Sequence, residues 1–251
     1  VGDFVLKIDG NQVTSGVATI LSAGAHTASE INLPGYSASS WGGNCNADGT
    51  ITLNPGDNKT CTITNDDIAP TLTLIKTVIN NNGGTKVVSD FILKIDEVSV
   101  TSGQAKTLSA GIHQAGEVSL FGYSPSGWTG NCTTEGFVSL LPGDNKTCYI
   151  TNDDIAPTLT FTKLLSYLYG GTALVSNFNL YINNQSVTSG VTNSLTANTL
   201  YSLTEDPLNG YTSLGFGGEC NSNGTITLNP GDNKTCTLTN QDVQPKLTVI
   251  K

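Results

Sequence analysis

The segment TNDDIAPTLTLIK, from Thr64 to Lys76, decides how the chain is organised. It returns almost unchanged at Thr151–Lys163, and again, less well preserved, as TNQDVQPKLTVIK at Thr239–Lys251. Each copy contains alternating apolar and polar residues, which are typical of β-strands, and a proline that interrupts the pattern. We therefore predict that each copy contains the last strand of one domain, a joint, and the first strand of the next domain.

The six cysteines follow the same repeat. They form pairs with a constant spacing of 16 residues, and successive pairs are displaced by 87 and then by 88 residues. This pattern predicts one disulfide per domain and an oxidising, extracytoplasmic setting, with free buried thiols as the alternative. The predicted disulfides are Cys45–Cys61, Cys132–Cys148 and Cys220–Cys236.

The chain between these landmarks consists of short alternating runs separated by Gly, Asn, Pro and Ser, without a helical period. We therefore predict an all-β fold with three tandem Ig-like β-sandwich domains, at 1–69, 70–156 and 157–244. The first domain lacks the opening strand that the other two carry, and 245–251 is an opening strand with no domain after it. These two gaps are complementary, so we expect 245–251 to pair with the next subunit or the next repeat.

Composition excludes several classes of function. The chain has 11 basic and 20 acidic residues and a net charge of −9, which repels a phosphate backbone, so nucleic-acid binding is not expected. No run approaches the roughly 18 apolar residues of a membrane span. The sequence contains no zinc-type cysteine cluster, nucleophile elbow or phosphate loop. We therefore expect no resident metal or cofactor and no turnover of an external substrate.

Strand alternation places three kinds of polar side chain on apolar faces. Residues i, i+2 and i+4 share one face of a strand, so Lys76 points the same way as Leu72 and Leu74. The same rule turns an asparagine of each closing strand, and a glutamate ahead of each Gly-Tyr pair, toward the core. Buried polar groups need partners, because an unpaired buried charge is costly. The residues are Lys76, Lys163 and Lys251, then Asn65, Asn152 and Asn240, and finally Glu30, Glu117 and Glu205.

Lysine, asparagine and glutamate in one apolar core can react with each other. Burial favours the neutral forms of amines and carboxyl groups. A neutral amine beside a protonated carboxyl group can attack the carboxamide, expel ammonia and leave a Lys–Asn isopeptide bond. The alternative involves no chemistry, because a strand lysine often extends its amine to solvent and an asparagine often hydrogen-bonds a turn.

At these residues the sequence resembles the B-type repeat domains of Gram-positive collagen adhesins and pilins, which have the SpaA-like or prealbumin-like fold. That family carries a lysine on its first strand, an asparagine on its last, and a catalytic glutamate in a Leu-x-Glu segment followed by Pro and Gly-Tyr. The best match here is LTEDPLNGY, at Leu203–Tyr211, whereas the other copies have Ala28 and Ala115 in place of the leucine. The paired cysteines depart from the family pattern and indicate a divergent branch.

The resemblance implies one Lys–Asn bond in each complete domain. The first domain has Asn65 and Glu30 but no lysine of its own, so the expected partner is Lys251 of a neighbouring copy, delivered by donor-strand complementation. The implied sets are Lys76 and Asn152 with Glu117, Lys163 and Asn240 with Glu205, and Lys251 and Asn65 with Glu30.

The function expected from this reasoning is that of a structural subunit of an extracellular filament or pilus at the cell surface. Head-to-tail contacts do not close on themselves, so identical subunits would form a homopolymer. The alternative is a fragment of a long tandem-repeat adhesin stalk. Enzymatic activity would be limited to single-turnover formation of the isopeptide bonds.

Two further features concern the surface. The pairs Asp66–Asp67 and Asp153–Asp154 at the joints offer oxygen ligands for Ca²⁺, or they are solvated turn residues. Sequons for N-glycosylation fit a surface protein, or they are ordinary turn residues. The sequons lie at Asn58, Asn131, Asn145, Asn184, Asn223 and Asn233.

Overall fold

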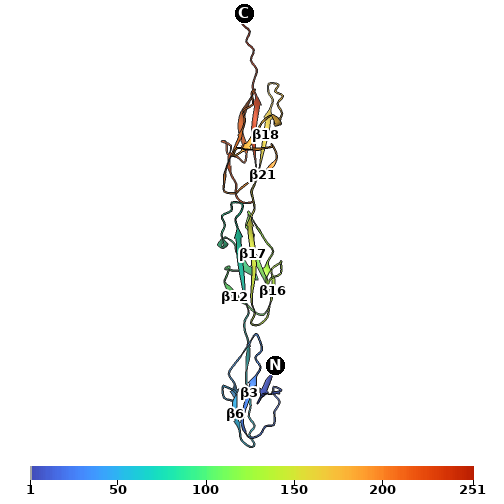
Figure 1. Ribbon diagram of the computed structural model, residues 1–251, viewed down its shortest axis with the longest axis vertical. Coiled ribbons are helices and arrows are strands. Elements are labelled where there is room, and N and C mark those ends of the chain that lie inside the picture. The colour runs from blue at the N-terminus through green and yellow to red at the C-terminus, as the bar shows by residue number, and fades with distance from the viewer. Residues whose placement is uncertain (1) are drawn as a thin grey trace. The chain divides into compact units, whose positions relative to one another are not determined.

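The computed structural model describes residues 2–251. The regular elements in this range are β-strands, apart from the short 3₁₀ helices η1 (Val88–Asp90) and η2 (Val175–Asn177). The predicted all-β class is therefore confirmed, and Figure 1 shows strands in each of the three repeats. Within the same residues, no helix is long and apolar enough to cross a membrane.

Residue contacts divide the chain into two compact units. The first unit contains the residues up to 75, which include the first repeat, together with 94–116 and 128–149. The second unit contains 76–93, 117–127 and 150–251. The border between the units passes through the second repeat. The domain boundaries inferred from the sequence therefore stay predictions.

The first repeat contains one four-stranded antiparallel sheet and two short strand pairs. The sheet has the order β2 (Asn11–Val13), β1 (Leu6–Ile8), β3 (Gly24–Glu30) and β6 (Thr50–Leu53). Figure 1 shows β3 beside β6 in its blue part. The two pairs are β4 (Tyr36–Ala38) with β8 (Asn65–Asp67), and β5 (Gly42–Gly43) with β7 (Cys61–Thr62).

The second repeat contains two sheets. One has the order β11 (Val98–Val100), β10 (Leu93–Ile95), β13 (Gly111–Glu117) and β16 (Phe137–Leu140). The other has the order β12 (Ala105–Thr107), β9 (Thr71–Ile79), β17 (Asn145–Asp154) and β14 (Tyr123–Pro125), with β15 (Thr129–Gly130) also paired to β17. Strand β9 is the opening strand, and among the described residues the first repeat has no counterpart of it.

The third repeat has the same plan. One sheet has the order β20 (Gln185–Val187), β19 (Leu180–Ile182), β22 (Leu200–Glu205) and β24 (Thr225–Thr227). The other has the order β21 (Thr192–Ser194), β18 (Thr158–Ser166), β25 (Asn233–Asp242) and β23 (Tyr211–Gly218). The opening strand β18 and the closing strand β25 run parallel, in register from Thr158 opposite Asn233 to Ser166 opposite Gln241.

The core of the third repeat lies between its two sheets. Leu159, Phe161, Leu180, Leu203 and Leu228 are almost completely buried there. Alternate residues of β18 face this core, as the sequence predicts, and the last of them is a lysine. The closing strands β17 and β25 likewise bury the predicted asparagines.

Residues 243–251 do not form a strand in the described chain. Leu247, Val249 and Ile250 are largely exposed, at 91%, 86% and 87%. A strand needs a neighbour to satisfy its backbone N–H and C=O groups. The pairing predicted for 245–251 therefore stays a prediction.

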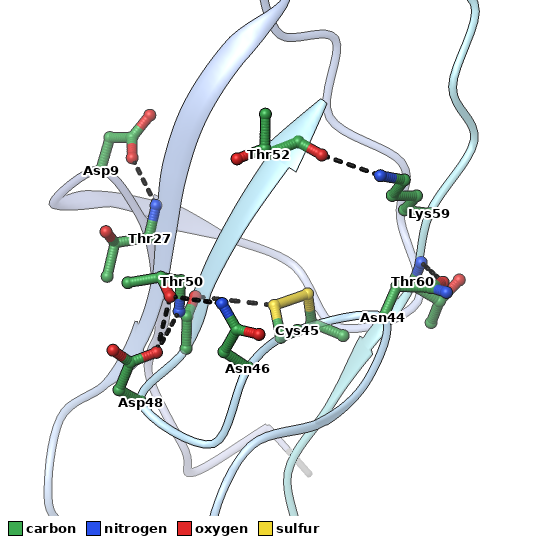
Figure 2. The surroundings of a disulfide bond; sticks show 12 residues. Asp9, Thr27, Asn44, Cys45, Asn46, Asp48, Thr50, Thr52, Lys59 and Thr60 are labelled. Atoms are coloured by element: carbon green, nitrogen blue, oxygen red, sulfur yellow. Dashed lines mark hydrogen bonds between the residues drawn. A yellow bond between two sulfur atoms is a disulfide. The ribbon is translucent and has the colours of Figure 1, made fainter. Parts of the chain in front are cut away.

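All three predicted disulfides are present, at Cys45–Cys61, Cys132–Cys148 and Cys220–Cys236. Figure 2 shows that Asn46 and Asp48 bind Thr50 beside the first disulfide, and that Asn44 accepts a hydrogen bond from the backbone of Thr60. Each disulfide thus attaches an Asn- or Thr-rich loop to a strand.

We expect the double substitution Cys132→Ser with Cys148→Ser to lower the free energy of unfolding of the second repeat by about 3 kcal/mol, because the unfolded chain gains loop entropy. Urea denaturation followed by tryptophan fluorescence, with Trp41 replaced by Phe, reports this repeat through Trp128. The same measurement on the Thr133→Ser variant is the control. A double variant as stable as the control would contradict the prediction.

Candidate functional site

Strand β9 carries a lysine into the core of the second repeat. The Nζ atom of Lys76 lies 2.8 Å from Oε2 of Glu117, and these side chains are 0% and 5% exposed. Asn152, on the closing strand β17, donates a hydrogen bond from Nδ2 to Oε1 of the same glutamate, at 2.6 Å. One carboxylate therefore holds both the amine and the carboxamide.

The third repeat contains the same arrangement of lysine, glutamate and asparagine, although the residues around them differ. The Nζ atom of Lys163 lies 2.5 Å from Oε2 of Glu205, and these side chains are 0% and 8% exposed. Asn240 donates from Nδ2 to Oε1 of Glu205 at 2.6 Å. In both repeats the structure thus brings together the three residue types predicted from the sequence, and we refer to each set as a triad.

The surroundings of the triads favour a neutral amine. Burial lowers the pKa of Lys76 and of Lys163, and in each case the adjacent glutamate acts in the opposite direction. The amines lie over the rings of Phe91 and Phe178, 4.6 and 4.5 Å from the ring centroids. A lysine with a lowered pKa more readily supplies the unprotonated amine that a nucleophilic attack requires.

The first repeat contains only two members of a triad. Asn65 donates from Nδ2 to Oε1 of Glu30 at 2.8 Å. No lysine pairs with Glu30 among residues 2–251. Lys251, the predicted third member, is exposed.

The first repeat has a groove of about 410 Å³ whose lining includes Leu6, the residue opposite Glu30 in the register of β1 and β3. Its apolar lining also includes Ile8 and Trp41, and all three side chains are half-buried. Their counterparts in the second repeat are more deeply buried. They are Leu93, Ile95 and Trp128, all nearly fully buried.

Sequence reasoning missed a second set of buried polar residues, at the ends of the closing strands. Asp154 and Asp242 are only 2% and 3% exposed. Each accepts several backbone N–H bonds from the loop that follows the opening strand. Alternation from Asn152 to Asp154 places the aspartate on the core face, whereas the Asp-Asp pair by itself indicates a joint residue.

The structure bears on two further predictions, the Ca²⁺ ligands at the joints and the glycosylation sites on the surface. No group of three or more metal-binding side chains occurs in the part of the chain that the structure describes. Asp154, half of a proposed Ca²⁺ pair, uses both carboxylate oxygens to accept backbone hydrogen bonds. The six sequon asparagines are all exposed, and their glycosylation stays a prediction: Asn58, Asn131, Asn145, Asn184, Asn223 and Asn233.

The first two repeats each contain one histidine at the same position. Each of its two ring nitrogens lies close to an oxygen that can accept a hydrogen bond. His26 contacts Asp9 through Nδ1 at 2.6 Å and the carbonyl oxygen of Ser22 through Nε2 at 2.8 Å. His113 has the same two contacts with Asp96 and Ser109. Because a carboxylate and a carbonyl only accept, both ring nitrogens donate, as in the protonated imidazolium. The third repeat has Tyr201 at this position.

We expect these histidines to make the first two repeats less stable at alkaline pH. The hydrogen bond to the aspartate raises the pKa of His26 and of His113 above 6.5, so their contribution is complete below that value and is lost as pH rises through the raised pKa. The same bond lowers the pKa of Asp9 and of Asp96, so their contribution is lost as pH falls below 3.8.

Hydrogen exchange measured separately on peptides of the three repeats, at about pH 5.5 and about pH 8.5 with correction for intrinsic rates, checks this expectation. The His113→Tyr variant, which imitates the third repeat, should lose the pH dependence in the second repeat only. Equal pH dependence in all three repeats would contradict the assignment to histidine.

Comparison with known proteins gives the family. A family model described as the prealbumin-like fold domain matches residues 2–63, 67–150 and 154–238. No curated protein matches the chain. Several solved structures are similar at low sequence identity, and these likenesses concern the fold.

The TIE protein of Bacillus anthracis is 13% identical, with a TM-score of 0.42, and the match covers 97% of this chain and 59% of that one. The pilus adhesin SpaC of Lactobacillus rhamnosus GG is 12% identical, with a TM-score of 0.33 and coverage of 87% and 42%. The major pilin T-13 of Streptococcus pyogenes is 14% identical, with a TM-score of 0.28 and coverage of 84% and 100%. The chain thus spans little more than half, or less, of the first two proteins. Its three family matches together cover most of its length, and the chain belongs to the prealbumin-like fold domain family, with three tandem copies of the domain.

Proposed function

We propose that the chain is a structural subunit of an extracellular filament or pilus at the cell surface, whose domains are closed by Lys–Asn isopeptide bonds. The observation that carries this proposal is the pair of buried triads. In each, a single glutamate contacts both the lysine amine and the asparagine amide. A fully buried ion pair of this kind is a weak source of stability by itself, because desolvation offsets the attraction.

The proposed reaction is a condensation that needs no cofactor. In the third repeat, Nζ of Lys163 forms a bond to Cγ of Asn240, and the bond between Cγ and Nδ2 breaks. Glu205 takes a proton from Nζ and passes it to Nδ2, which leaves as ammonia. The second repeat would react in the same way. Because each site reacts once and is consumed, the chain is not an enzyme in the usual sense.

The first repeat supports the proposal that subunits join by strand donation. Its groove is lined by the half-buried Leu6 and Ile8. Their third-repeat counterparts, Leu180 and Ile182, pack in one buried core with Leu159 and Phe161 of the opening strand. Asn65 and Glu30 are already hydrogen-bonded to each other. The segment 245–251 has the alternation of an opening strand, and its apolar side chains are exposed. We propose that 245–251 of one copy fills the groove of another, and that Lys251 then reacts with Asn65. This contact is heterologous and would extend a homopolymer.

A second candidate is a tandem-repeat adhesin stalk, in which the same groove takes the opening strand of a preceding repeat in one longer polypeptide. The observation that favours it is the similarity of Thr239–Lys251 to the internal joints at Thr64–Lys76 and Thr151–Lys163. Both candidates use the same strand pairing and the same chemistry. They differ in whether the donor strand comes from another molecule.

Denaturing gel electrophoresis and intact mass after boiling with reductant test the proposal. We expect a ladder of multimers, a loss of one ammonia for each triad, and a tryptic cross-link between Lys251 and Asn65. The Lys251→Ala variant should abolish the ladder, and Lys246→Ala, on the opposite strand face of the same segment, should not. A single species much larger than 26.1 kDa from the native source would favour the stalk. A mass without any loss of ammonia would refute the isopeptide chemistry.

A further inference from the structure

The loop that follows the opening strand is fastened by the closing strand of the second repeat. The carboxylate of Asp154 accepts backbone N–H bonds from Asn81 at 2.8 Å, from Asn82 at 3.0 Å and from Gly84 at 2.5 Å. Nδ2 of Asn82 also donates to the backbone carbonyl of Asp154 at 2.7 Å. Three N–H donors directed at one buried carboxylate form a specific clasp for this loop.

A tyrosine completes the clasp. The hydroxyl group of Tyr123 accepts a hydrogen bond from the backbone of Lys86 at 3.0 Å and donates one to Oδ1 of Asn80 at 2.6 Å. A Cβ atom on Gly84 would collide with this hydroxyl oxygen and with Cβ of Asp154. The loop therefore needs glycine at this position to reach the aspartate.

The third repeat contains the same clasp. Asp242 accepts from the backbones of Leu168 and Tyr169 at 2.7 Å and of Gly171 at 2.8 Å. The hydroxyl group of Tyr211 accepts from the backbone of Ala173 at 2.8 Å. The clasp is therefore a regular part of a repeat whose opening strand is in place.

The first repeat contains the receiving half of this clasp without the loop. Tyr36 lies opposite Asp67 in the register of β4 and β8, as Tyr123 lies opposite Asp154. The Tyr36 ring packs edge-on against Phe4 at 5.3 Å, as the Tyr123 ring packs against Phe91 at 5.4 Å. Unlike its counterparts, Asp67 is exposed.

We infer that the ligand of the first repeat is a longer peptide than a strand alone: an alternating strand that ends in a lysine, followed by an Asn- and Gly-containing loop whose backbone binds Asp67. Its template is the sequence of residues 70–87. This inference rests on the proposed strand donation and extends it, because residues 245–251 match only the strand part of this template and residues 77–87 of the template add the loop.

Peptide titration tests the inference. The receptor is the full chain with Lys251→Ala, so that its own terminal lysine cannot react. A short peptide has the sequence of residues 70–78, and a long peptide has that of residues 70–87. We expect the long peptide to bind at least about tenfold more tightly, which corresponds to about 1.4 kcal/mol. Isothermal titration calorimetry measures binding, and intact mass measures covalent addition at Asn65.

Matched substitutions in the receptor and in the peptide test whether the clasp causes the difference in affinity between the long and the short peptide. The Asp67→Asn receptor should bind both peptides equally, whereas the neighbouring Asp66→Asn receptor should still prefer the long one. A long peptide with Gly84→Val should bind like the short one, because the added side chain prevents the close approach.

The possible failures are distinguishable. If both peptides bind equally and both react with Asn65, strand donation stands and the clasp is refuted. If the long peptide is favoured equally by the Asp67→Asn and Asp66→Asn receptors, its extra affinity comes from elsewhere and the clasp is again refuted. If neither peptide binds, strand donation and the clasp are refuted together.

Discussion

Replacing Glu205 by alanine is expected to leave the third repeat without its internal cross-link. The reduced wild-type chain should lack two molecules of ammonia, one for each triad, and the Glu205→Ala chain should lack only one. The reason is that Glu205 is the group in contact with both reacting partners, at 2.5 Å from Lys163 and 2.6 Å from Asn240. Without it no acid or base carries the proton from the amine to the leaving nitrogen. Intact mass spectrometry resolves the difference directly.

The matched control for this experiment is Glu219→Ala. Glu219 also pairs with a lysine, Lys234, at 2.9 Å, but both side chains are partly exposed and no asparagine amide completes the set. This variant should retain the full loss of ammonia. A Glu205→Ala chain that still lacks two ammonia molecules would show that the carboxylate is dispensable and would overturn the proposed mechanism.

Replacing Lys163 by methionine is expected to leave the third repeat about 3–5 kcal/mol less stable than it is in the double variant Lys163→Met with Glu205→Gln, because the single variant keeps the buried charge of Glu205 without its cation. Neither variant can form the cross-link, so only the buried charge differs between them. Hydrogen exchange of peptides from residues 158–242 reports the third repeat separately, which matters because a multidomain chain need not unfold in one step.

The partly exposed ion pair of Lys234 and Glu219 again provides the control. Lys234→Met removes a lysine from a solvent-exposed ion pair, and such pairs contribute about 1 kcal/mol or less. A difference between Lys163→Met and the double variant that is no larger than the effect of Lys234→Met would mean that Glu205 finds solvent or another partner, contrary to its buried position.

Sequence reasoning predicted the parts of this protein that depend on strand periodicity and residue spacing. Alternation alone placed Lys163 and Asn240 on the core face, and constant spacing paired all six cysteines. The same alternation, ahead of each Gly-Tyr pair, pointed to the glutamates. The structure places Glu117 and Glu205 beside their lysines, even though the copy with Glu117 has alanine where the family motif has leucine. These features are local, so a single sequence is sufficient to reveal them.

The clasps at Asp154 and Asp242 could not be predicted in the same way. Each aspartate binds the backbone of a loop that lies 70 to 74 residues earlier in the chain. Backbone donors leave no side-chain signature except a glycine, and Gly84 and Gly171 also fit ordinary turns. The sequence also could not show whether 245–251 forms a strand, because a strand needs a neighbouring strand with which to pair.

The parallel pairing of β18 and β25 has a mechanical consequence. A force that pulls on Thr158, where the chain enters the repeat, and on Asp242, where it leaves, slides these two strands lengthwise, so the hydrogen bonds of the ladder resist it together. A covalent link from Lys163 to Asn240 would carry the tension directly from one strand to the other. Residues 164–239, which would extend to roughly 250 Å if pulled straight, would then bear no load. Each closed domain would transmit force as an inextensible link.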